Sequence, residues 1–322
     1  PDDFKTIDEI SSSKGNKNYI SENARNNARI VPQNSVLVTC IGVIGKVMIS
    51  ESELSFNQQI NAIVPNELIL SKYLAYLLLY NKSKLDFISN APVVPIINKT
   101  QFSEFEVTFH ENIDVQEMII QKLENLDNQI LKRRNQSKLL SNLVKSRFNE
   151  MFGDVILNDK EWKISKWNEI LTIRNGKNQK NVEDKNGQFP IYGSGGIIGY
   201  AKDWIVKKNS VIIGRKGNIN KPILVRENFW NVDTAFGLEP TLEKINSEYL
   251  FYFCQLYNFE KLNKAVTIPS LTKSDLLDIS LPLPPLTLQN EFADFVAQVD
   301  KSQFACQIVI KLWRNSLKSS II

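Results

Sequence analysis

The sequence predicts a mixed α+β protein in which two homologous globular domains are separated by two long antiparallel coiled-coil helices, related by a pseudo-two-fold axis. Three observations predict this fold class: a stretch from Gln116 to Phe148 with helical apolar spacing and no Pro or Gly, a second such stretch over 289–319, and matching segments ahead of each. We therefore expect a first domain at 1–112, a first helix at 113–150, a second domain at 151–286 and a second helix at 287–322.

The two helices are predicted from apolar positions spaced alternately four and three residues apart, the pattern of a helix that packs against another along a narrow seam. Adding 173 to each seam position of the first helix gives a seam position of the second. In one antiparallel register Arg133 lies opposite Gln303 as a central polar layer, and residues 123 and 313 are close enough to crosslink. The apolar seam residues are Ile119, Leu123, Leu126, Ile130, Leu140, Val144, Phe292, Val296, Val299, Ile310, Trp313 and Leu317.

In the first domain, β-branched stretches bounded by Asn, Gly and Ser predict strands. We expect strands at 35–42, 46–50 and 56–64 and a mostly buried helix at 71–81. The segment 98–109 is expected to form a helical turn followed by a strand.

The second domain repeats this order, because three pairs of segments match in sequence. VPQNSVLVTCIGVIGK matches VKKNSVIIGRKGNINK, KYLAYLLLY matches EYLFYFCQL, and VPIINKTQF matches IPSLTKSDL, which aligns Pro95 with Pro269. The second domain also inserts NGQFPIYGSGGIIGY, at 186–200, which has no counterpart in the first. A shared scaffold with divergent loops is expected of a fold that varies its recognition surface.

Composition sets wider limits on the class of protein. A net charge of +4 and a pI near 8.8 favour a polyanionic partner only weakly. Three widely spaced cysteines, Cys40, Cys254 and Cys306, fit a reducing cytoplasm and argue against a disulfide framework or a cysteine-rich metal site. The sequence has no long apolar run and a polar start, so we expect neither a membrane span nor a signal peptide. Because no initiator Met is present, we expect some N-terminal residues of the first domain to be missing.

The sequence lacks the motifs of common catalytic and metal sites. His110 is the single histidine and is expected to be an exposed loop residue. The motifs HExxH, CxxC, GxxxxGK[ST] and GxSxG are absent, and GSGGIIG at 193–199 fits a tight loop better than a dinucleotide site. Nor does the Asn-Pro-Pro-aromatic stretch of amino-methyltransferases occur. Carboxylates are plentiful but unpaired in any motif, which leaves a carboxylate-only mechanism open. We expect a binding protein with no catalytic residue, no metal and no cofactor.

The loops carry chemistry suited to nucleic acid. The run Gly214 to Asn218 sets Arg215, Lys216 and an amide between glycines after a strand, where Arg can contact guanine or phosphate. Each polar loop residue is also typical of a solvated loop, and the cluster 132–134 is either a DNA patch or a solvated helix face. The candidate DNA-binding residues are Thr39, Lys46, Asn57, Gln58, Gln59, Asn98, Lys99, Lys177, Asn178, Tyr192, Ser194, Arg215, Lys216, Asn218, Asn231, Asp233, Thr267, Ser270, Thr272 and Lys273.

Four segments, VPQNSVLVTCIGVIGK, SFNQQINAIVP, FPIYGSGGIIGY and LPLPPLTLQNEF, closely resemble the DNA-specificity (S) subunit of type I restriction-modification systems. The resemblance covers essentially the whole chain. It implies two target-recognition domains that each read one half of a bipartite site in double-stranded DNA, with the helices as a spacer. It also implies two methyltransferase partners that hold S-adenosylmethionine and methylate adenine, and a separate motor-nuclease subunit that uses ATP and Mg.

Geometry agrees with this resemblance. A 33-residue helix is about 50 Å long at 1.5 Å per residue, or roughly 15 base pairs of DNA. Antiparallel helices present the two domains in opposite orientations, as half-sites on antiparallel strands require. Two alternatives stay open: a fused specificity and methyltransferase or nuclease enzyme, and a scaffold that uses the same repeat to hold proteins.

Overall fold

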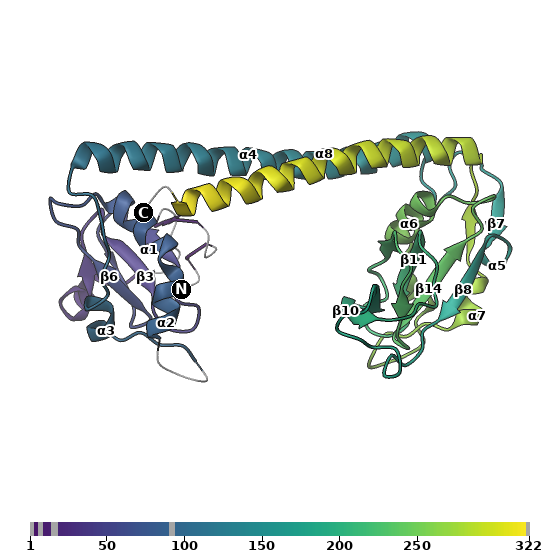
Figure 1. Ribbon diagram of the computed structural model, residues 1–322, viewed down its shortest axis with the longest axis horizontal. Helices are drawn as coiled ribbons and strands as arrows, with labels where there is room; N and C mark the ends of the chain where they lie inside the picture. Colours follow the sequence, from purple (N-terminus) through teal and green to yellow (C-terminus); the bar gives the residue numbers. More distant parts are fainter. Residues whose placement is uncertain (1–2, 6–8, 14–18, 90–93, 320–322) are drawn as a thin grey trace. The chain divides into compact units, whose positions relative to one another are not determined.

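The structure, a computed structural model, describes residues 3–5, 9–13, 19–89 and 94–319, with the backbone alone for 315–319. The chain forms two compact units: unit 1 comprises Pro1–Arg134 with Gln307–Ile322, and unit 2 comprises Asn135–Cys306. Each unit combines a globular α+β part with one half of each long helix (Figure 1). These helices are α4 (Ile113–Phe152) and α8 (Leu286–Ser319).

The globular part of unit 1 is built on a four-stranded sheet of order β1-β4-β3-β6. Its central strand β3 pairs antiparallel with both β4 and β6, whereas β1 pairs parallel with β4. A separate ladder joins β2 to β5. The strands are β1 (Ser11–Ser12), β2 (Ile30–Val31), β3 (Val36–Thr39), β4 (Val47–Ile49), β5 (Leu54–Ser55) and β6 (Ile60–Ile63).

Helix α1 (Ser71–Tyr80) fills the space between this sheet and α4. All residues from Tyr73 to Leu79 are buried, because one face of α1 packs on Val36 and Val38 of the sheet and another on Leu123 of α4. This confirms the predicted buried helix. The remaining helices of unit 1 are η1 (Glu22–Asn27), α2 (Lys82–Ile88) and α3 (Lys99–Ser103).

The strand expected after α3 is not formed, since residues 104–110 have no strand pairing. In unit 2 the corresponding strand, β15 (Ser280–Pro282), pairs with β7 (Ile164–Lys166). The part of unit 1 that corresponds to β7 includes residues 6–8, which lie outside the described residues.

Unit 2 repeats the plan of unit 1 and enlarges it. Its main sheet has the order β12-β11-β14-β8, and a second sheet has the order β10-β9-β13. The strands are β8 (Leu171–Asn175), β9 (Phe189–Gly193), β10 (Gly196–Ala201), β11 (Ser210–Gly214), β12 (Ile223–Val225), β13 (Trp230–Asn231) and β14 (Ala235–Pro240). The helices are α5 (Trp167–Ile170), α6 (Ser247–Leu256), η2 (Phe259–Leu262) and α7 (Lys273–Leu277).

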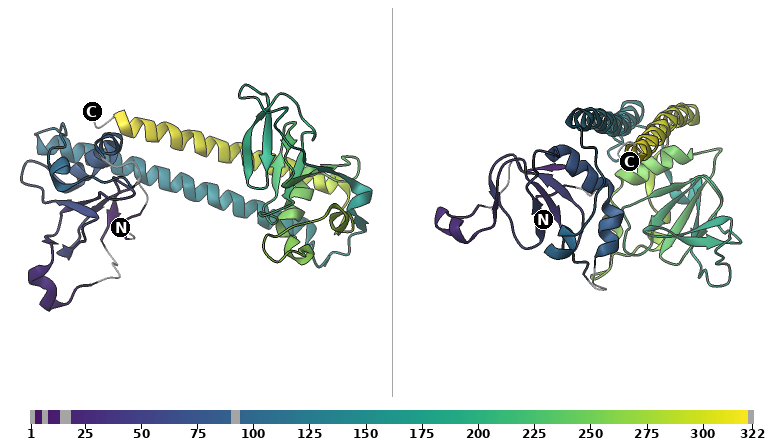
Figure 2. Two further views of the ribbon diagram at one scale, coloured as in Figure 1. Left: turned by 90° about the horizontal axis from the view of Figure 1, so that it is seen from below. Right: turned by 60° about the vertical axis from the view of Figure 1, so that its left-hand side comes forward.

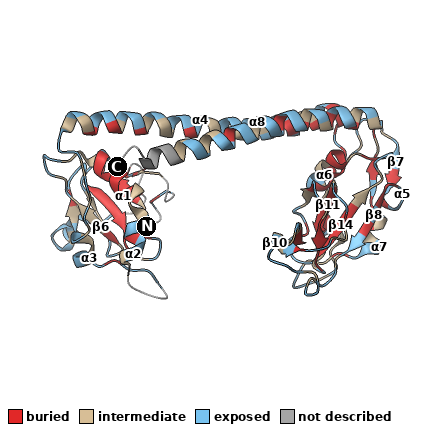
Figure 3. Cartoon of the chain, viewed as in Figure 1, coloured by how far each residue is buried: buried red, intermediate tan, exposed pale blue. Residues whose placement is uncertain are grey.

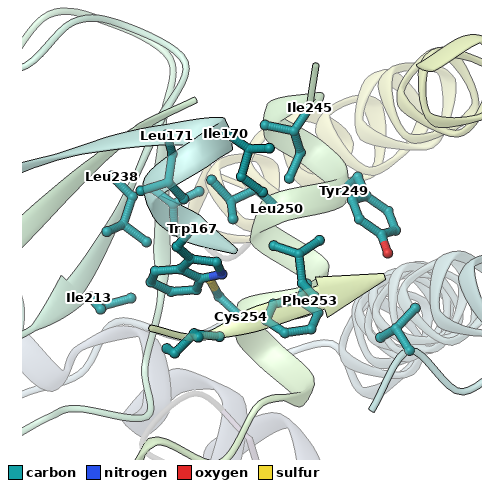
Figure 4. Packing of buried hydrophobic residues seen from close by; sticks show 14 of the residues in the cluster. Trp167, Ile170, Leu171, Ile213, Leu238, Ile245, Tyr249, Leu250, Phe253 and Cys254 are labelled. Carbon is teal, nitrogen blue, oxygen red and sulfur yellow. The ribbon is translucent and has the colours of Figure 1, made fainter. Parts of the chain in front are cut away.

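The core of unit 2 surrounds α6. Trp167, Leu250 and Phe253 are fully buried between α5, α6 and the main sheet (Figure 4). Both long helices add aromatic rings to this core, because Phe148 of α4 lies edge-on to Phe292 of α8 with ring centroids 5.3 Å apart. The helix halves are therefore part of the domain cores in addition to pairing with each other.

The predicted repeat is confirmed in backbone detail. Asn34 and Asn209, at the same position ahead of β3 and β11, both adopt positive φ, 66° and 58°. Their carbonyls accept hydrogen bonds from Ser71 Oγ at 2.6 Å and Ser247 Oγ at 2.7 Å, respectively. Two segments that share few side chains thus fold alike.

The long helices pair antiparallel, as shown within unit 2 by two contacts. Phe148 packs on Phe292, and Gln303 Nε2 donates to the Ser137 carbonyl at 3.0 Å and to Ser141 Oγ at 2.8 Å. In Figure 2 the two ribbons run side by side along this part of unit 2. Gln303 therefore contacts α4 one helical turn beyond Arg133, so the expected register, with Arg133 opposite Gln303, is wrong. The expected closeness of residues 123 and 313 stays a prediction. The seam repeats at each turn, so its spacing alone allowed both registers, whereas the aromatic contact fixes one.

The residues of the predicted seam differ in burial. Seven of the twelve apolar seam residues are buried: Ile119, Leu123, Ile130, Val144, Phe292, Val296 and Val299. Leu126, Leu140, Ile310 and Trp313 are half-buried, and the side chain of Leu317 lies outside the described residues. Figure 3 shows buried positions in red along α4 and α8, among intermediate and exposed ones. Within the described part of the chain, no helix has the length and hydropathy needed to span a membrane.

Candidate nucleic-acid interface

Two loops of unit 2 are tied together at the end of β11. The amide of Gly217 donates to the Pro269 carbonyl at 3.0 Å, and the amide of Leu271 donates to the Arg215 carbonyl at 2.9 Å. Between these bonds Lys216 and Ser270 form an antiparallel bridge. Gly217 has φ of 81°, a conformation that side chains disfavour, so its place in the turn suits glycine. We call this backbone arrangement the clasp.

Unit 1 contains the same clasp. Gly42 donates to the Pro95 carbonyl at 3.0 Å, Ile97 donates to the Cys40 carbonyl at 2.9 Å, and Ile41 bridges Ile96. Gly42 also has positive φ, 77°. The glycine and the proline are shared, but Cys40 and Ile41 stand where unit 2 has Arg215 and Lys216. The clasp is therefore a common frame that presents different side chains in the two units.

In unit 2 a third segment reaches the clasp, the turn between β9 and β10. Ser194 Oγ lies 3.8 Å from the position that a Cβ on Gly217 would occupy. Asn218 Nδ2 lies 3.6 Å from the corresponding position on Gly195. The glycine-rich segment 193–199, expected to form a tight loop, thus contains a hairpin turn that lies beside the loop of Arg215.

The cationic group of Arg215 is oriented by an aromatic ring. Its Cζ lies 5.8 Å from the ring centroid of Phe236, a buried residue of β14, and the side chain is half-buried. A cation over a ring face is attracted by the ring's negative quadrupole. This contact limits the rotamers of Arg215, so that less side-chain entropy is lost when the guanidinium binds a base edge or a phosphate.

Most of the residues predicted to bind DNA are accessible. In unit 2 the exposed ones are Lys177, Asn178, Lys216, Asn218, Asp233, Thr267, Thr272 and Lys273, and the half-buried ones are Ser194, Arg215 and Ser270. In unit 1 the exposed ones are Asn57, Gln58, Asn98 and Lys99, and the half-buried ones are Lys46 and Gln59.

Three predicted residues face the interior instead. Asn231 is fully buried, and its Nδ2 donates to the Ala235 carbonyl at 2.9 Å. Tyr192 packs edge-on against Phe229 at 5.5 Å, and burial raises the pKa of its hydroxyl. Thr39 Oγ1 donates to the Val43 carbonyl at 2.6 Å and accepts from the Lys46 amide at 3.0 Å. These side chains hold the loops in shape, so the interface that we propose below does not include direct contacts from them.

Two further predicted residues serve as helix caps. Asn98 Oδ1 accepts from the Gln101 amide at 2.9 Å in a capping box of α3, and Thr272 Oγ1 accepts from the Asp275 amide at 3.2 Å at the start of α7. Both side chains remain exposed. Their hydrogen-bonding groups are therefore partly committed to the protein.

One buried glutamine joins each long helix to its domain. Gln116 Oε1 accepts from the Leu70 amide at 2.8 Å, and its Nε2 donates to the carbonyls of Leu68 and His110 at 2.8 and 2.7 Å. Gln289 repeats this, accepting from the Asn246 amide at 2.8 Å and donating to the Pro284 carbonyl at 2.7 Å. Both side chains are 0% exposed.

No side-chain pattern in the sequence points to these glutamines, because an isolated Gln is usually solvated. The signal that was present is the offset of 173 residues, which relates Gln116 to Gln289. A polar residue repeated at the start of both helices is a candidate for a buried joint.

A carboxylate on each long helix also contacts the domain on which that helix packs. The hydroxyl of Tyr76 donates to Asp127 Oδ2 at 2.9 Å, and burial raises the pKa of Asp127, an effect that this hydrogen bond opposes. At the equivalent place in unit 2, Arg226 pairs with Glu248 of α6 and with Asp300 of α8. Among the described residues no group of three His, Cys, Asp or Glu side chains is placed to hold a metal ion.

Comparison with known proteins gives the chain its relatives. Residues 4–139 and 159–308 match the family model described as "Type I restriction modification DNA specificity domain". The chain is 24% identical over its whole length to the type I restriction enzyme MjaIX specificity subunit of Methanocaldococcus jannaschii, of which it covers 84%. It is 25% identical to the EcoDI specificity subunit of Escherichia coli over 44% of this chain and 33% of that protein.

Solved structures show the same fold. The S subunit of a type I restriction-modification system from M. genitalium aligns with a TM-score of 0.59 at 17% identity, covering 98% of this chain and 88% of that one. A second structure, concerned with complex assembly and conformational transition of the type I R-M system, aligns with a TM-score of 0.58 at 14% identity, covering 91% and 82%. At these identities the likeness shows the fold alone.

Proposed function

The chain belongs to the family of type I restriction-modification DNA specificity domains, and from this premise we propose that it is the subunit that selects the DNA site for adenine methylation and restriction by its partners. Unit 1 binds one half of a bipartite site and unit 2 binds the other. The chain itself performs no chemistry and holds no cofactor, and it acts in the cytoplasm, where the DNA is.

The observation that carries this proposal is the clasp, which occurs in both units with different side chains. A frame that is kept while its side chains change is what two readers of different half-sites require. In unit 2 the clasp presents Arg215, Lys216 and Asn218, which suit guanine edges, phosphates and adenine edges, respectively. In unit 1 the exposed Asn57 and Gln58, which suit adenine, precede Gln59, whose carbonyl accepts from the Cys40 amide of the clasp at 2.8 Å.

Phosphate contacts fix the pose of a protein on DNA without reading sequence. The exposed lysines Lys177, Lys216 and Lys273 of unit 2 supply these phosphate contacts, as do the exposed Lys99 and the half-buried Lys46 of unit 1. Because each phosphate contact releases counterions, affinity for duplex DNA is expected to fall steeply with salt.

The partners are proposed to be two methyltransferase subunits that carry S-adenosylmethionine, together with restriction subunits that use ATP and Mg. The long helices support this proposal. In unit 2, Leu139 and Leu143 of α4 and Phe304 of α8 are exposed, although Val144, Val296 and Val299 of the seam are buried. Large apolar side chains exposed on paired helices are typical of a surface that a protein partner covers.

The test is selection of duplexes from a random pool by the complex assembled with its partner subunits. We expect an enriched motif with two fixed parts separated by unspecified bases, and an affinity that falls with rising salt. Selection of no motif, with salt-dependent binding retained, would mean that the chain binds DNA without reading it. No DNA binding at any salt concentration would favour the protein scaffold instead.

A further inference from the structure

The hairpin formed by β9 and β10 ends in two adjacent exposed isoleucines. Ile197 is 53% exposed and Ile198 is 56% exposed, on a hairpin that has no counterpart in the described residues of unit 1. Large aliphatic side chains in consecutive positions rarely both face solvent on a regular strand, because neighbours on a strand point to opposite faces. The sequence pattern alone therefore predicts one of them inside.

A β-bulge explains why both are outside. Ile197 pairs with Tyr192 and Gly199 pairs with Ile191, so Ile198 is an extra residue with no partner on β9. Bulges bend a strand and redirect side chains, and they occur next to functional sites more often than elsewhere. Here the bulge interrupts the alternation and leaves a small apolar surface that the protein does not cover.

This apolar surface adjoins the clasp of unit 2. Ile198 Cγ2 lies 3.7 Å from the position of a Cβ on Gly193, and Thr234 Oγ1 lies 3.6 Å from the same point. The carbonyl of Thr234 in turn accepts from the Arg215 amide at 2.8 Å. Ile198 and the turn of the same hairpin, where Ser194 approaches Gly217, therefore lie beside the polar loop of Arg215.

The chemistry of base edges identifies what such a surface fits. Hydrogen-bonding groups line the major groove, and the apolar group that a standard base presents there is the C5-methyl of thymine. Arg215, Lys216 and Asn218 suit the polar groups, and an aliphatic pair beside them suits the methyl group. We propose that Ile197 and Ile198 recognise the 5-methyl group of a thymine in the half-site bound by unit 2. This inference rests on the proposed function.

The test removes the methyl group from the DNA and the isoleucines from the protein. The half-site is first defined by selection with the assembled complex, and each thymine in it is then replaced in turn by deoxyuridine, which lacks only the C5-methyl. For the unaltered complex we expect one replacement to weaken binding about fourfold, which corresponds to ~0.8 kcal/mol for one buried methyl group. For the Ile197→Ser, Ile198→Ser double variant, the same replacement is expected to change binding less than about twofold.

Two controls belong to this experiment. Ile164→Ser removes a side chain that is 58% exposed on β7, in a different sheet of the same unit, and should leave the response to deoxyuridine unchanged. Deoxyuridine in the half-site bound by unit 1 should affect the unaltered complex and the double variant equally. Thermal melting of each complex establishes that the double variant is folded.

The inference is overturned if every deoxyuridine replacement acts equally on both complexes, or if the half-site contains no thymine. It is also overturned if the double variant binds DNA normally but fails to assemble, because the hairpin would then contact a protein partner. Failure of the proposed function looks different: the unaltered complex would then show no sequence preference at all.

Discussion

Units 1 and 2 share a frame and differ in what it presents. Both have the clasp, both have an asparagine with positive φ ahead of the central strand, and both are joined to a long helix by a buried glutamine. At the clasp, unit 1 has the buried Cys40 and the half-buried Ile41, whereas unit 2 has Arg215 and Lys216 and adds the β9–β10 hairpin. The comparison teaches that the backbone bonds which position the loops can be kept while the side chains at the loops differ.

The largest effect is expected from truncating the rings and aliphatic groups that the long helices add to each core. Phe292→Ala in unit 2 should lower the free energy of unfolding by about 3–5 kcal/mol, and Leu123→Ala in unit 1 by about 2–5 kcal/mol, because both side chains are fully buried. Chemical denaturation measures both. Leu139→Ala, at an exposed position of α4, is the control and should cost far less. A small effect at only one of the buried sites would mean that the helix is not part of that core.

The next prediction compares the two buried glutamines that join the long helices to their domains. Gln116→Ala and Gln289→Ala each leave buried backbone groups without partners, so each should cost about 1–3 kcal/mol of unfolding free energy. Gln298→Ala, on an exposed position of α8, should cost almost nothing. If one joint proved important and the other dispensable, the two units would not be held to their helices in the same way.

A substitution at the clasp should separate the units functionally. Arg215→Ala is expected to weaken or relax recognition of the half-site bound by unit 2 by about 1–3 kcal/mol and to leave the other half-site unchanged. Binding to a panel of duplexes varied in each half measures this. Lys208→Ala, an exposed cation of the same unit outside the clasp, is the matched control. Equal losses in both halves would contradict an independent reader in each unit.

The smallest effect concerns Asp127 and Asp300, which occupy equivalent positions 173 residues apart. Burial raises the pKa of Asp127, so the folded state binds a proton more readily than the unfolded chain does. Above that raised pKa, Asp127 is ionised in the folded state and lowers the stability of the protein. Asp127→Asn should therefore stabilise the protein slightly at neutral pH, and its advantage should shrink as the pH falls through the raised pKa. Asp300→Asn instead breaks an exposed ion pair with Arg226 and should have little effect at any pH. Melting temperatures of the two variants across pH 4–7 distinguish these cases. If the stability gained by Asp127→Asn grew on acidification, the pKa of Asp127 would not be raised in the folded protein.

Much of the fold was predictable from the sequence because it depends on local spacing. The seam positions and the repeat could be found from the offset of 173 residues, and the buried helix α1 from its apolar run. The helix register could not, since several registers bury the same seam, and it is the contacts of Phe148 with Phe292 and of Gln303 with Ser137 that distinguish them. The prediction therefore placed Arg133 one turn away from where Gln303 finds its partner, Ser137.

The site was predictable in outline only. The polar loops could be named from composition, but whether a loop residue faces DNA or the interior depends on tertiary contacts, as the buried Asn231 and Thr39 show. The bulge at Ile198 also has no sequence signature, because it is defined by pairing with β9. The contacts of individual residues with DNA stay predictions.

The central claim is that one frame, used twice, reads two independent half-sites. Its most direct test is to map methylated adenines in cells that express the partner subunits with either the unaltered chain or the Arg215→Ala, Lys216→Ala, Asn218→Ala variant. We predict a bipartite motif for the unaltered chain and, for the variant, loss of preference in one half while the other half is retained. A single undivided motif, or simultaneous loss of both halves in a folded and assembled complex, would contradict the account.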